Sequence, residues 1–490
     1  MDLQRARRAA RRSGAPKKTR AAVEDPRFDR QLKATRYLIT SAQNATPVHE
    51  KFLACLRVAA KHLRAEIVVI PLRYKNPTSQ WSTKQESEDW WAPEVEPHLF
   101  NQRRKLNANL VLVGDVKIQP TASSPLTGFE ALTGAESCII GHPKMQFRSV
   151  AAPTGRYPKI LSTTGACTKK NYTDTKAGKL GEFHHYLGAL LVELDGKHFH
   201  LRQLNADRIT GEFTDLDTHY TATGAKQAPP AAALVLGDAH ARFMDPVVDR
   251  ATFGEGGIVE TLNPEIVVWH DTHDGYACNP HHEGNPFIAA AKGAAGFGNV
   301  RAEVEHAVKF VADRCAGRRA VLVSSNHDNF LSRWIVNTDW RRTPGNAAFY
   351  LETAQAMLQS TRMTPGGTRY ADPFKYWVER LRGTAAIRVL DSDERFTVLG
   401  VECGQHGHDG PNGSGATVKN LSRLGAKMIT GHGHAPEISE GHYRVGTSTP
   451  LRLEYTRGPS SWQNTHAVIY ASGKRALVTI IDGRWRAPAR

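Results

Sequence analysis

The sequence predicts a mixed α/β protein built from two folded domains. A length of 490 residues suits two or three domains of about 150 residues each. The apolar fraction of 40% is sufficient for hydrophobic cores, which excludes disorder of the whole chain. Short β-branched runs alternate with segments whose apolar residues recur at helical spacing, a pattern typical of α/β proteins.

The composition also argues against membrane and secreted classes. No run approaches the roughly 18 consecutive apolar residues that cross a bilayer, and the basic start is not followed by the apolar stretch of a secretory signal. The six cysteines are scattered without a C-x-x-C pair, which argues against disulfides and thiolate zinc sites. We therefore expect a soluble, cytoplasmic protein without a membrane partner.

The domain expected over residues 32–224 begins with a strand–helix–strand unit. This unit resembles part of a Rossmann-like fold, which binds a cofactor in a crevice. It lacks the glycine fingerprint of such a site, so a structural module without a cofactor is the simpler interpretation. Later segments are shorter and are punctuated by Gly, Thr and Pro, so this α/β domain is expected to be partly β-rich. The expected elements are strands at 36–41, 66–70 and 110–113, a helix at 48–63, and β-rich structure from about 118 to 222.

A second domain is expected over residues 233–490, after an Ala/Pro-rich linker at 225–232. Five apolar strands in this domain each deliver Asp, Asn or His where the strand ends. Carboxyl ends of neighbouring strands meet at one edge of a sheet, and alternate residues share a face, so these side chains are expected to converge. The five segments are Gly237-Asp-Ala-His240 after the strand at 233–236, His270-Asp-Thr-His-Asp274 after 265–269, Ser325-Asn-His-Asp328 after 320–324, Gly404-Gln-His-Gly-His408 after 396–399, and Gly431-His-Gly-His434 after 426–430.

This ordered set resembles the calcineurin-like metallophosphoesterase superfamily, whose motifs run D-x-H, G-D-x-x-D, G-N-H-D/E, H and G-H-x-H. The resemblance covers about residues 231–482. It implies a four-layer α/β/β/α sandwich with two divalent metal ions, and oxygen and imidazole ligands favour Mn²⁺, with Fe, Zn²⁺ or Mg²⁺ as alternatives. His270 and Ser325 stand where the motifs usually have glycine, but neither change removes a ligand.

Carried over position by position, the resemblance implies which residues hold the metals. Asp271 would bridge both ions. His327 would be a non-ligand that acts on the leaving-group oxygen as a general acid or a cation, with Asp328 orienting it. In the fourth segment both His406 and His408 fit, and His406 is favoured. The first ion would be held by Asp238, His240 and His434, and the second by Asn326, His406 and His432.

The positive charge favours a nucleic-acid partner. The chain carries a formal net charge of +16, of which +7 falls within residues 1–20. Lys and Arg supply most non-specific affinity by neutralising phosphates, so the segment 1–31 is expected to be a disordered arm that is either solvated or in contact with DNA. The arginines predicted to contact DNA are Arg5, Arg7, Arg8, Arg11 and Arg12 in the arm, and Arg242 and Arg333 near the metal site.

Two N-terminal segments narrow the range of candidate substrates. The segments 36–49 and 73–79 resemble the amino-terminal region of the early DNA-transfer proteins of T-five-type bacteriophages, where a similar module precedes a metallophosphoesterase domain. Membership would imply a phage-encoded, Mn²⁺-favouring DNase that acts in the host cytoplasm in host DNA degradation and DNA transfer. Two alternatives stay open: a nucleotide or cyclic-nucleotide phosphohydrolase, and a DNA-binding or scaffold protein with a secondary metal site. The sequence leaves homo-oligomerisation open as well.

Overall fold

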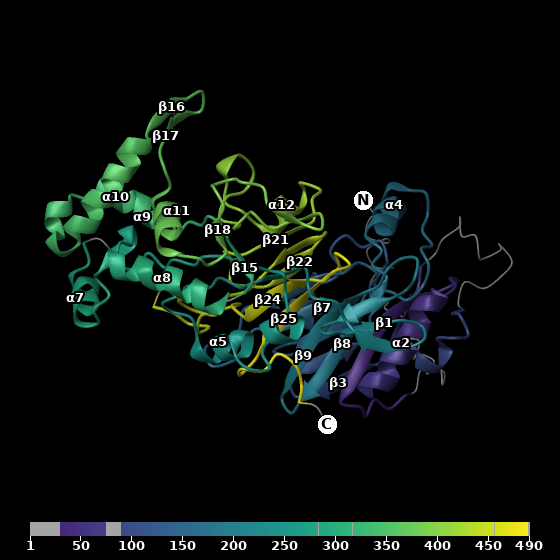
Figure 1. Ribbon diagram of the computed structural model, residues 1–490. Coiled ribbons are helices and arrows are strands. Elements are labelled where there is room, and N and C mark those ends of the chain that lie inside the picture. The colour runs from purple at the N-terminus through teal and green to yellow at the C-terminus, as the bar shows by residue number, and fades with distance from the viewer. Residues whose placement is uncertain (1–29, 75–89, 283, 316, 455, 489–490) are drawn as a thin grey trace, which may run out of the picture.

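The computed structural model describes residues 30–74, 90–282, 284–315, 317–454 and 456–488. These residues form a mixed α/β protein with several mixed sheets (Figure 1). The basic segment 1–31 lies almost wholly outside the described residues. Within them, no helix combines the length and the apolar character needed to span a membrane.

A six-stranded sheet carries the first three polar segments. Strands β13, β14, β15 and β18 run parallel; β24 pairs antiparallel with β13 and forms an antiparallel hairpin with β25. The register places Val235 opposite Val268, and Val268 opposite Val321, so three parallel strands end level with one another. Their residues are mostly apolar because both faces of the sheet are covered. In spatial order the strands are β18 (Ile387–Val389), β15 (Arg319–Leu322), β14 (Ile266–Trp269), β13 (Ala233–Val235), β24 (Asn464–Ile469) and β25 (Arg475–Ile480).

A ten-stranded sheet takes strands from both halves of the chain. The halves meet where β22 pairs antiparallel with β6, with Ile438 opposite the buried Phe147. This sheet thus crosses the predicted boundary at 225–232, whose first three residues form β12. In spatial order its strands are β19 (Thr397–Val398), β20 (Val401–Glu402), β21 (Met428–Thr430), β23 (His442–Arg444), β22 (Glu437–Ser439), β6 (Phe147–Val150), β7 (Lys159–Thr163), β5 (Ser137–Ile140), β4 (Leu110–Val113) and β3 (Arg103–Asn107).

The predicted N-terminal strand–helix–strand unit is present. Strand β1 (Arg36–Gln43) pairs parallel with β2 (Glu66–Leu72), and α2 (Glu50–Leu63) connects them. Strand β1 also pairs antiparallel with β8 (Gly188–Asp195), which forms a hairpin with β9 (His198–Asn205). The sheet therefore differs from the mostly parallel Rossmann arrangement, because the tight turn between β8 and β9 imposes antiparallel pairing.

The three large sheets share one core. This core includes Ile39 of the four-stranded sheet, Val268 of the six-stranded sheet and Ile139 of the ten-stranded sheet. Strand β9 lies beside β25, where the Leu477 N–H donates to Oε1 of Gln203 (2.8 Å). The four- and six-stranded sheets therefore form one layer opposite the ten-stranded sheet. The smaller strands are β10 (Phe213–Asp215), β11 (Thr218–Tyr220) and β12 (Ala225–Gln227) in one sheet, and β16 (Arg362–Thr364) and β17 (Gly367–Arg369) in another.

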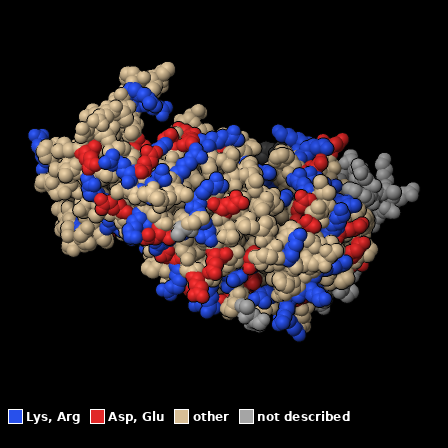
Figure 2. Space-filling view, viewed as in Figure 1, with Lys and Arg blue, Asp and Glu red and all other residues tan. Residues whose placement is uncertain are grey.

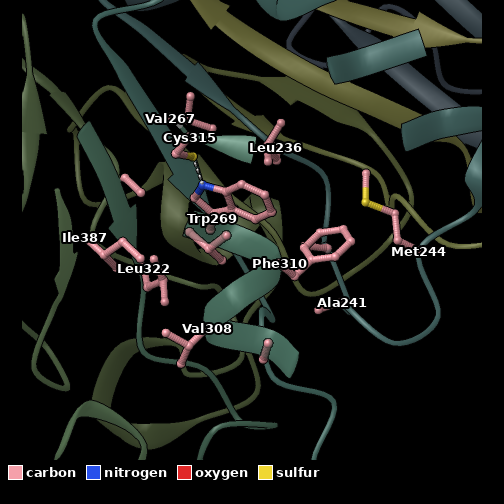
Figure 3. Close-up of a cluster of buried hydrophobic side chains, with 14 of the residues drawn as sticks. Leu236, Ala241, Met244, Val267, Trp269, Val308, Phe310, Cys315, Leu322 and Ile387 are labelled. Atoms are coloured by element: carbon pink, nitrogen blue, oxygen red, sulfur yellow. Dashed lines mark hydrogen bonds between the residues drawn. The ribbon is translucent and has the colours of Figure 1, made fainter. Parts of the chain in front are cut away.

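Helices cover the outer face of the six-stranded sheet and anchor its strand ends. Trp269, the last residue of β14, stacks on Phe253 (centroids 5.6 Å apart) and packs edge-on against Phe310 (6.1 Å). Its Nε1–H donates to Sγ of Cys315 at 3.3 Å (Figure 3). Figure 1 shows α10 and the β16–β17 hairpin projecting at the side away from β1 and α2. The remaining helices are α3 (Phe129–Leu132), α4 (Lys176–Phe183), α5 (Pro246–Phe253), α6 (Ile258–Leu262), α7 (Pro286–Ala294), α8 (Val300–Arg314), α9 (Asn329–Asn337), α10 (Ala347–Ser360), α11 (Pro373–Leu381) and α12 (Val418–Ser422).

Since the ten-stranded sheet includes both halves of the chain, we expect the protein to unfold as one cooperative unit. Phe147→Ala, in the N-terminal half, should lower the free energy of unfolding by about 3–5 kcal/mol and shift the whole transition. Urea denaturation followed by tryptophan fluorescence and far-ultraviolet circular dichroism measures this. Leu132→Ala, at a side chain 48% exposed, is the control and should change stability by less than about 0.5 kcal/mol. Two separate transitions, with only one displaced, would contradict the prediction.

Candidate metal centre

The three parallel strands β13, β14 and β15 deliver polar side chains to one end of the six-stranded sheet. Asp238 follows β13, Asp271 follows β14 and Asn326 follows β15. Asp238 and Asp271 are at most 1% exposed. Backbone hydrogen bonds hold the first two loops together, because Ala239 N–H donates to His270 O (2.9 Å) and His240 N–H to Asp271 O (2.7 Å). Adjacent strand ends thus place the two carboxylates side by side.

The facing ten-stranded sheet supplies the histidines of the last two segments. His406 follows β20, while His432 and His434 follow β21. The two loops are joined where Gly431 N–H donates to His406 O at 2.8 Å. Gly431 is required here, since a Cβ at this position would clash with Oδ1 of Asp238 and crowd the His270 side chain.

Four of the predicted ligands form a buried cluster. One possible ligand atom from each of Asp238, His240, Asp271 and His434 lies within 4.8 Å of the others. His434 Nε2 lies 2.9 Å from Asp238 Oδ2. His240 Nε2 lies 3.7 Å from Asp271 Oδ2. The structure therefore brings these four side chains together from both sheets.

The other predicted ligands adjoin this cluster. Oδ1 of Asn326 is 3.1 Å from His406 Nε2 and 3.1 Å from His432 Nδ1. His406 Nε2 is also 3.3 Å from Asp271 Oδ2. Asp271 therefore lies between the two groups of side chains, as a bridging position requires. His432 is the exposed member of the set.

Several buried atoms of the cluster have no hydrogen-bond partner among the described residues. These atoms are Oδ1 of Asp238, Oδ1 of Asp271, Nε2 of His240 and Nδ1 of His434, whereas Oδ2 of Asp238 has its ion-pair contact with His434. Burying such groups without a partner costs several kcal/mol. A donor set of carboxylate, amide and imidazole without thiolate suits first-row divalent cations. The residues present therefore fit a metal site.

The electrostatics keep the carboxylates ionised. Burial raises the pKa of Asp238, but the contact with His434 and the charge of His406 outweigh it, so the pKa lies below its ordinary value. For Asp271 burial is likewise outweighed, by His406 and His327, and its pKa lies well below the ordinary value. Metal ligands must be deprotonated, so both carboxylates are in the form that binds a cation.

Four of these residues adopt left-handed backbone conformations. The φ values are 46° for His240, 44° for Asp271, 67° for His432 and 52° for His434. Such conformations are uncommon for residues other than glycine and cost on the order of 1–3 kcal/mol each. Their concentration in one cluster is typical of a functional site, where local strain aims side chains at a common point.

His327 lies beside the cluster, and its ring is oriented by Asp274, which was not among the predicted site residues. Its Nδ1 lies 2.8 Å from the backbone oxygen of Asp274, and its ring centroid is 4.8 Å from that of His240. Oδ1 of Asp274 also lies 3.2 Å from His240 Nδ1. Asp274 is the second aspartate of the D-x-x-D spacing, and this signal was available in the sequence.

Asp328, predicted to orient His327, is directed elsewhere. Its Oδ2 accepts a hydrogen bond from Ser325 N–H (3.1 Å), and Ser325 Oγ accepts one from Asp328 N–H (3.2 Å). Burial raises the pKa of Asp328 well above its ordinary value, and the charge of Asp271 adds to this. Asp328 therefore stabilises the turn that presents Asn326 and His327, and Asp274 contacts His327 in its place.

The structure separates the two histidines of the fourth segment. His406 is 2% exposed and contacts both Asp271 and Asn326. His408 is partly exposed and pairs with Asp409 (Nε2 to Oδ2, 3.2 Å). His270, which replaces the usual glycine, is fully buried with Nδ1 3.4 Å from Nδ1 of His406. His406 is therefore the better placed of the two alternatives.

The arginines predicted to bind DNA do not form one group. The side chain of Arg242 is 14% exposed, with Nε 3.7 Å from Glu303 and its guanidinium 4.5 Å from the centre of the Phe297 ring. Arg333 is exposed on α9. The arm residues Arg5, Arg7, Arg8, Arg11 and Arg12 lie outside the described residues. Arg242 is therefore held within the protein.

Comparison with known proteins places the chain in a family. No protein-family model matches it. Vps29 from Chaetomium thermophilum is similar in structure at 10% identity and a TM-score of 0.20, over 37% of this chain and 94% of that protein, which is too weak to support an argument. Protein A1 of Escherichia phage T5 is 32% identical over 465 residues, which make up 92% of this chain and 82% of Protein A1. This confirms the relation to T-five-type phages indicated by the N-terminal segments, and the chain belongs to the family of phage T5 Protein A1.

Proposed function

We propose that this protein is a metal-dependent phosphodiesterase that cleaves DNA, with a four-layer α/β/β/α metallophosphoesterase sandwich around its site. The observation that carries the proposal is the buried cluster of carboxylates and imidazoles in which Oδ1 of Asp238 and Oδ1 of Asp271 have no hydrogen-bond partner among the described residues. Family membership and the net charge of +16 add support for a phage protein that acts on DNA in the host cytoplasm.

The proposed ligands divide into two sets that share Asp271. Asp238, His240 and His434 would hold one divalent ion, and Asn326, His406 and His432 the other, with Mn²⁺ favoured. Two such ions, when bound, supply a water acidified for attack and positive charge that stabilises the phosphodiester transition state.

His327 is proposed to handle the proton of the leaving group. In the tautomer whose Nδ1–H donates to the Asp274 carbonyl, Nε2 is left for the substrate. Burial lowers the pKa of His327 despite the opposing charge of Asp271. A lowered pKa makes the protonated ring a stronger acid but a less populated one, and Nε2 is the atom from which it would donate to a departing alkoxide.

The DNA substrate is the finer part of the proposal. Figure 2 shows Lys and Arg interspersed with Asp and Glu on the face viewed, without one continuous basic field. A DNA path is therefore expected to depend on local cationic residues and on the basic segment 1–31. The two alternatives, hydrolysis of nucleotides and a scaffold with a secondary metal site, are separated by the experiments below.

The two histidines of the fourth segment give a matched test of the metal site. We expect His406→Ala to lose roughly one of two bound Mn²⁺ ions, because it removes a ligand beside Asp271. His408→Ala, two residues away, should retain both ions. Equilibrium dialysis followed by elemental analysis measures the metal content. Equal loss in both variants would contradict the assignment.

Asp271→Asn tests the enzymatic function. It keeps the size of the side chain but removes the charge proposed to join both ions, so Mn²⁺-dependent cleavage of plasmid DNA should fall by more than about 100-fold. Asp313→Asn, on the exposed surface of α8, is the control and should cleave as the wild type does. Brisk hydrolysis of nucleotides without cleavage of any form of DNA would favour the phosphohydrolase alternative. Full biological activity of Asp271→Asn would favour the scaffold.

Deletion of residues 1–20 tests the DNA contribution of the basic segment. This deletion removes a net charge of +7, so affinity for duplex DNA should fall by about tenfold or more, with a shallower dependence on salt. Fluorescence anisotropy in EDTA measures binding without cleavage, and the melting temperature reports on folding. Unchanged affinity and salt dependence would show that the segment is not a DNA contact.

A further inference from the structure

A groove lies beside the turn at 155–158. It consists of two adjoining hollows, of about 630 Å³ and about 230 Å³, which share this turn and Leu451 in their walls. The smaller hollow is also lined by Trp462, whose ring centroid lies 4.2 Å from that of the proposed ligand His434. We call the two hollows together the Trp462 groove. One wall residue of the groove thus contacts a proposed metal ligand.

The Trp462 groove carries cations along its length. Arg452 lines the smaller hollow, Arg156 lines both, and Lys197 lines the larger one. Arg156 and Lys197 are exposed, and neither forms an ion pair within the described residues. Phosphate groups spaced along a strand match cations that are spaced in this way.

Of the acidic residues that line the groove, Glu136 is paired with a lysine and Asp482 contacts two residues of the groove wall, so the cations outnumber the unpaired acids. Glu136 pairs with Lys105. Asp482 contacts the hydroxyl of Tyr157 and lies 3.0 Å from Nε2 of His198. The groove therefore keeps a local excess of positive charge.

A buried glutamine ties the wall of the larger hollow to the metal site. Gln463 is 4% exposed and lines the larger hollow. Its Nε2 donates to Ser149 Oγ (2.9 Å) and to the Pro158 carbonyl (3.3 Å), which fixes the orientation of the amide. Oε1 has no partner among the described residues. The backbone N–H of Gln463 donates to His434 O at 3.1 Å, so this wall is tied to the metal site.

We propose that the Trp462 groove binds a single strand of DNA and directs it to the metal centre. The inference rests on the proposed function, since it names the form of DNA that this site receives. Tyr157 is 41% exposed at the shared turn, and Trp462 lies at the metal end of the groove. Aromatic side chains stack on unpaired bases, whereas a duplex keeps its base faces covered.

The test measures binding of a fluorescein-labelled oligonucleotide of about 12 nucleotides, by anisotropy in EDTA. For the double variant Arg156→Ala/Lys197→Ala we expect Kd to rise about tenfold and the slope of log K against log salt to become shallower by about 1.4, for two phosphate contacts. Tyr157→Ala should raise Kd about fivefold or more, with little change in this slope, because stacking is not ionic. Affinity for a hairpin duplex without single-stranded ends should change by less than about twofold in each variant.

Arg362→Ala/Arg369→Ala is the matched control, because it removes the same charge from the β16–β17 hairpin. Melting temperatures show whether each variant is folded. If the Arg156→Ala/Lys197→Ala variant keeps the Kd and slope of the wild type, or if the control loses as much affinity, the groove does not bind the strand. Equal weakening for single strand and duplex would overturn the strand preference. Because EDTA prevents cleavage, these results are independent of the Mn²⁺-dependent nuclease assay, which alone decides the proposed function.

Discussion

The burial of two carboxylates, Asp238 and Asp271, is the electrostatic constraint on which the site depends. An ionised carboxylate in the protein interior costs several kcal/mol unless positive or hydrogen-bonding groups surround it. Here imidazoles surround the carboxylates: His434 Nε2 lies 2.9 Å from Asp238 Oδ2, and His406 Nε2 lies 3.3 Å from Asp271 Oδ2. Burial lowers the pKa of His240, but the hydrogen bond with Asp274 and the charge of Asp271 outweigh burial and raise the pKa to about 9. The cluster therefore has a strong affinity for positive charge.

This constraint explains why two facing sheets are needed. The six-stranded sheet supplies the carboxylates and Asn326, and the ten-stranded sheet supplies His406, His432 and His434. The loops approach so closely that only glycine fits at position 431, against Asp238. The left-handed conformations of the ligand residues are stable only because the strands behind them are firmly packed, as Trp269 is at the end of β14. Packing in the hydrophobic core thus offsets the free-energy cost of the local strain.

The sequence predicted the parts of the fold that depend on local patterns. Strands at 36–43, 66–72 and 110–113 and the helix at 50–63 lie where the apolar spacing indicated. Four of the five polar segments were recognisable because each follows an apolar strand, whereas the fourth follows the two-residue strand β20 and not the strand predicted at 396–399, where β19 lies. Long-range pairings were not predictable, and the union of β6 with β22 joins residues almost 300 positions apart (Phe147 and Ile438). Chain adjacency also misled the choice of Asp328, because the partner of His327 comes from a different loop, at Asp274.

Spatial position, and not sequence position, also decides which arginines are available to contact a phosphate. Arg242 is two residues from His240, yet its guanidinium faces Glu303 and Phe297. Arg156 is far from every metal-ligand segment in sequence, but it lines a groove whose other wall residue, Trp462, contacts His434. Both arginines contribute one unit to the net charge. An arginine that already pairs with a carboxylate, however, gains less from contact with a phosphate. The proposed capacity to hold DNA would therefore depend on which cations form no ion pair, as Arg156 and Lys197 in the walls of the Trp462 groove form none among the described residues.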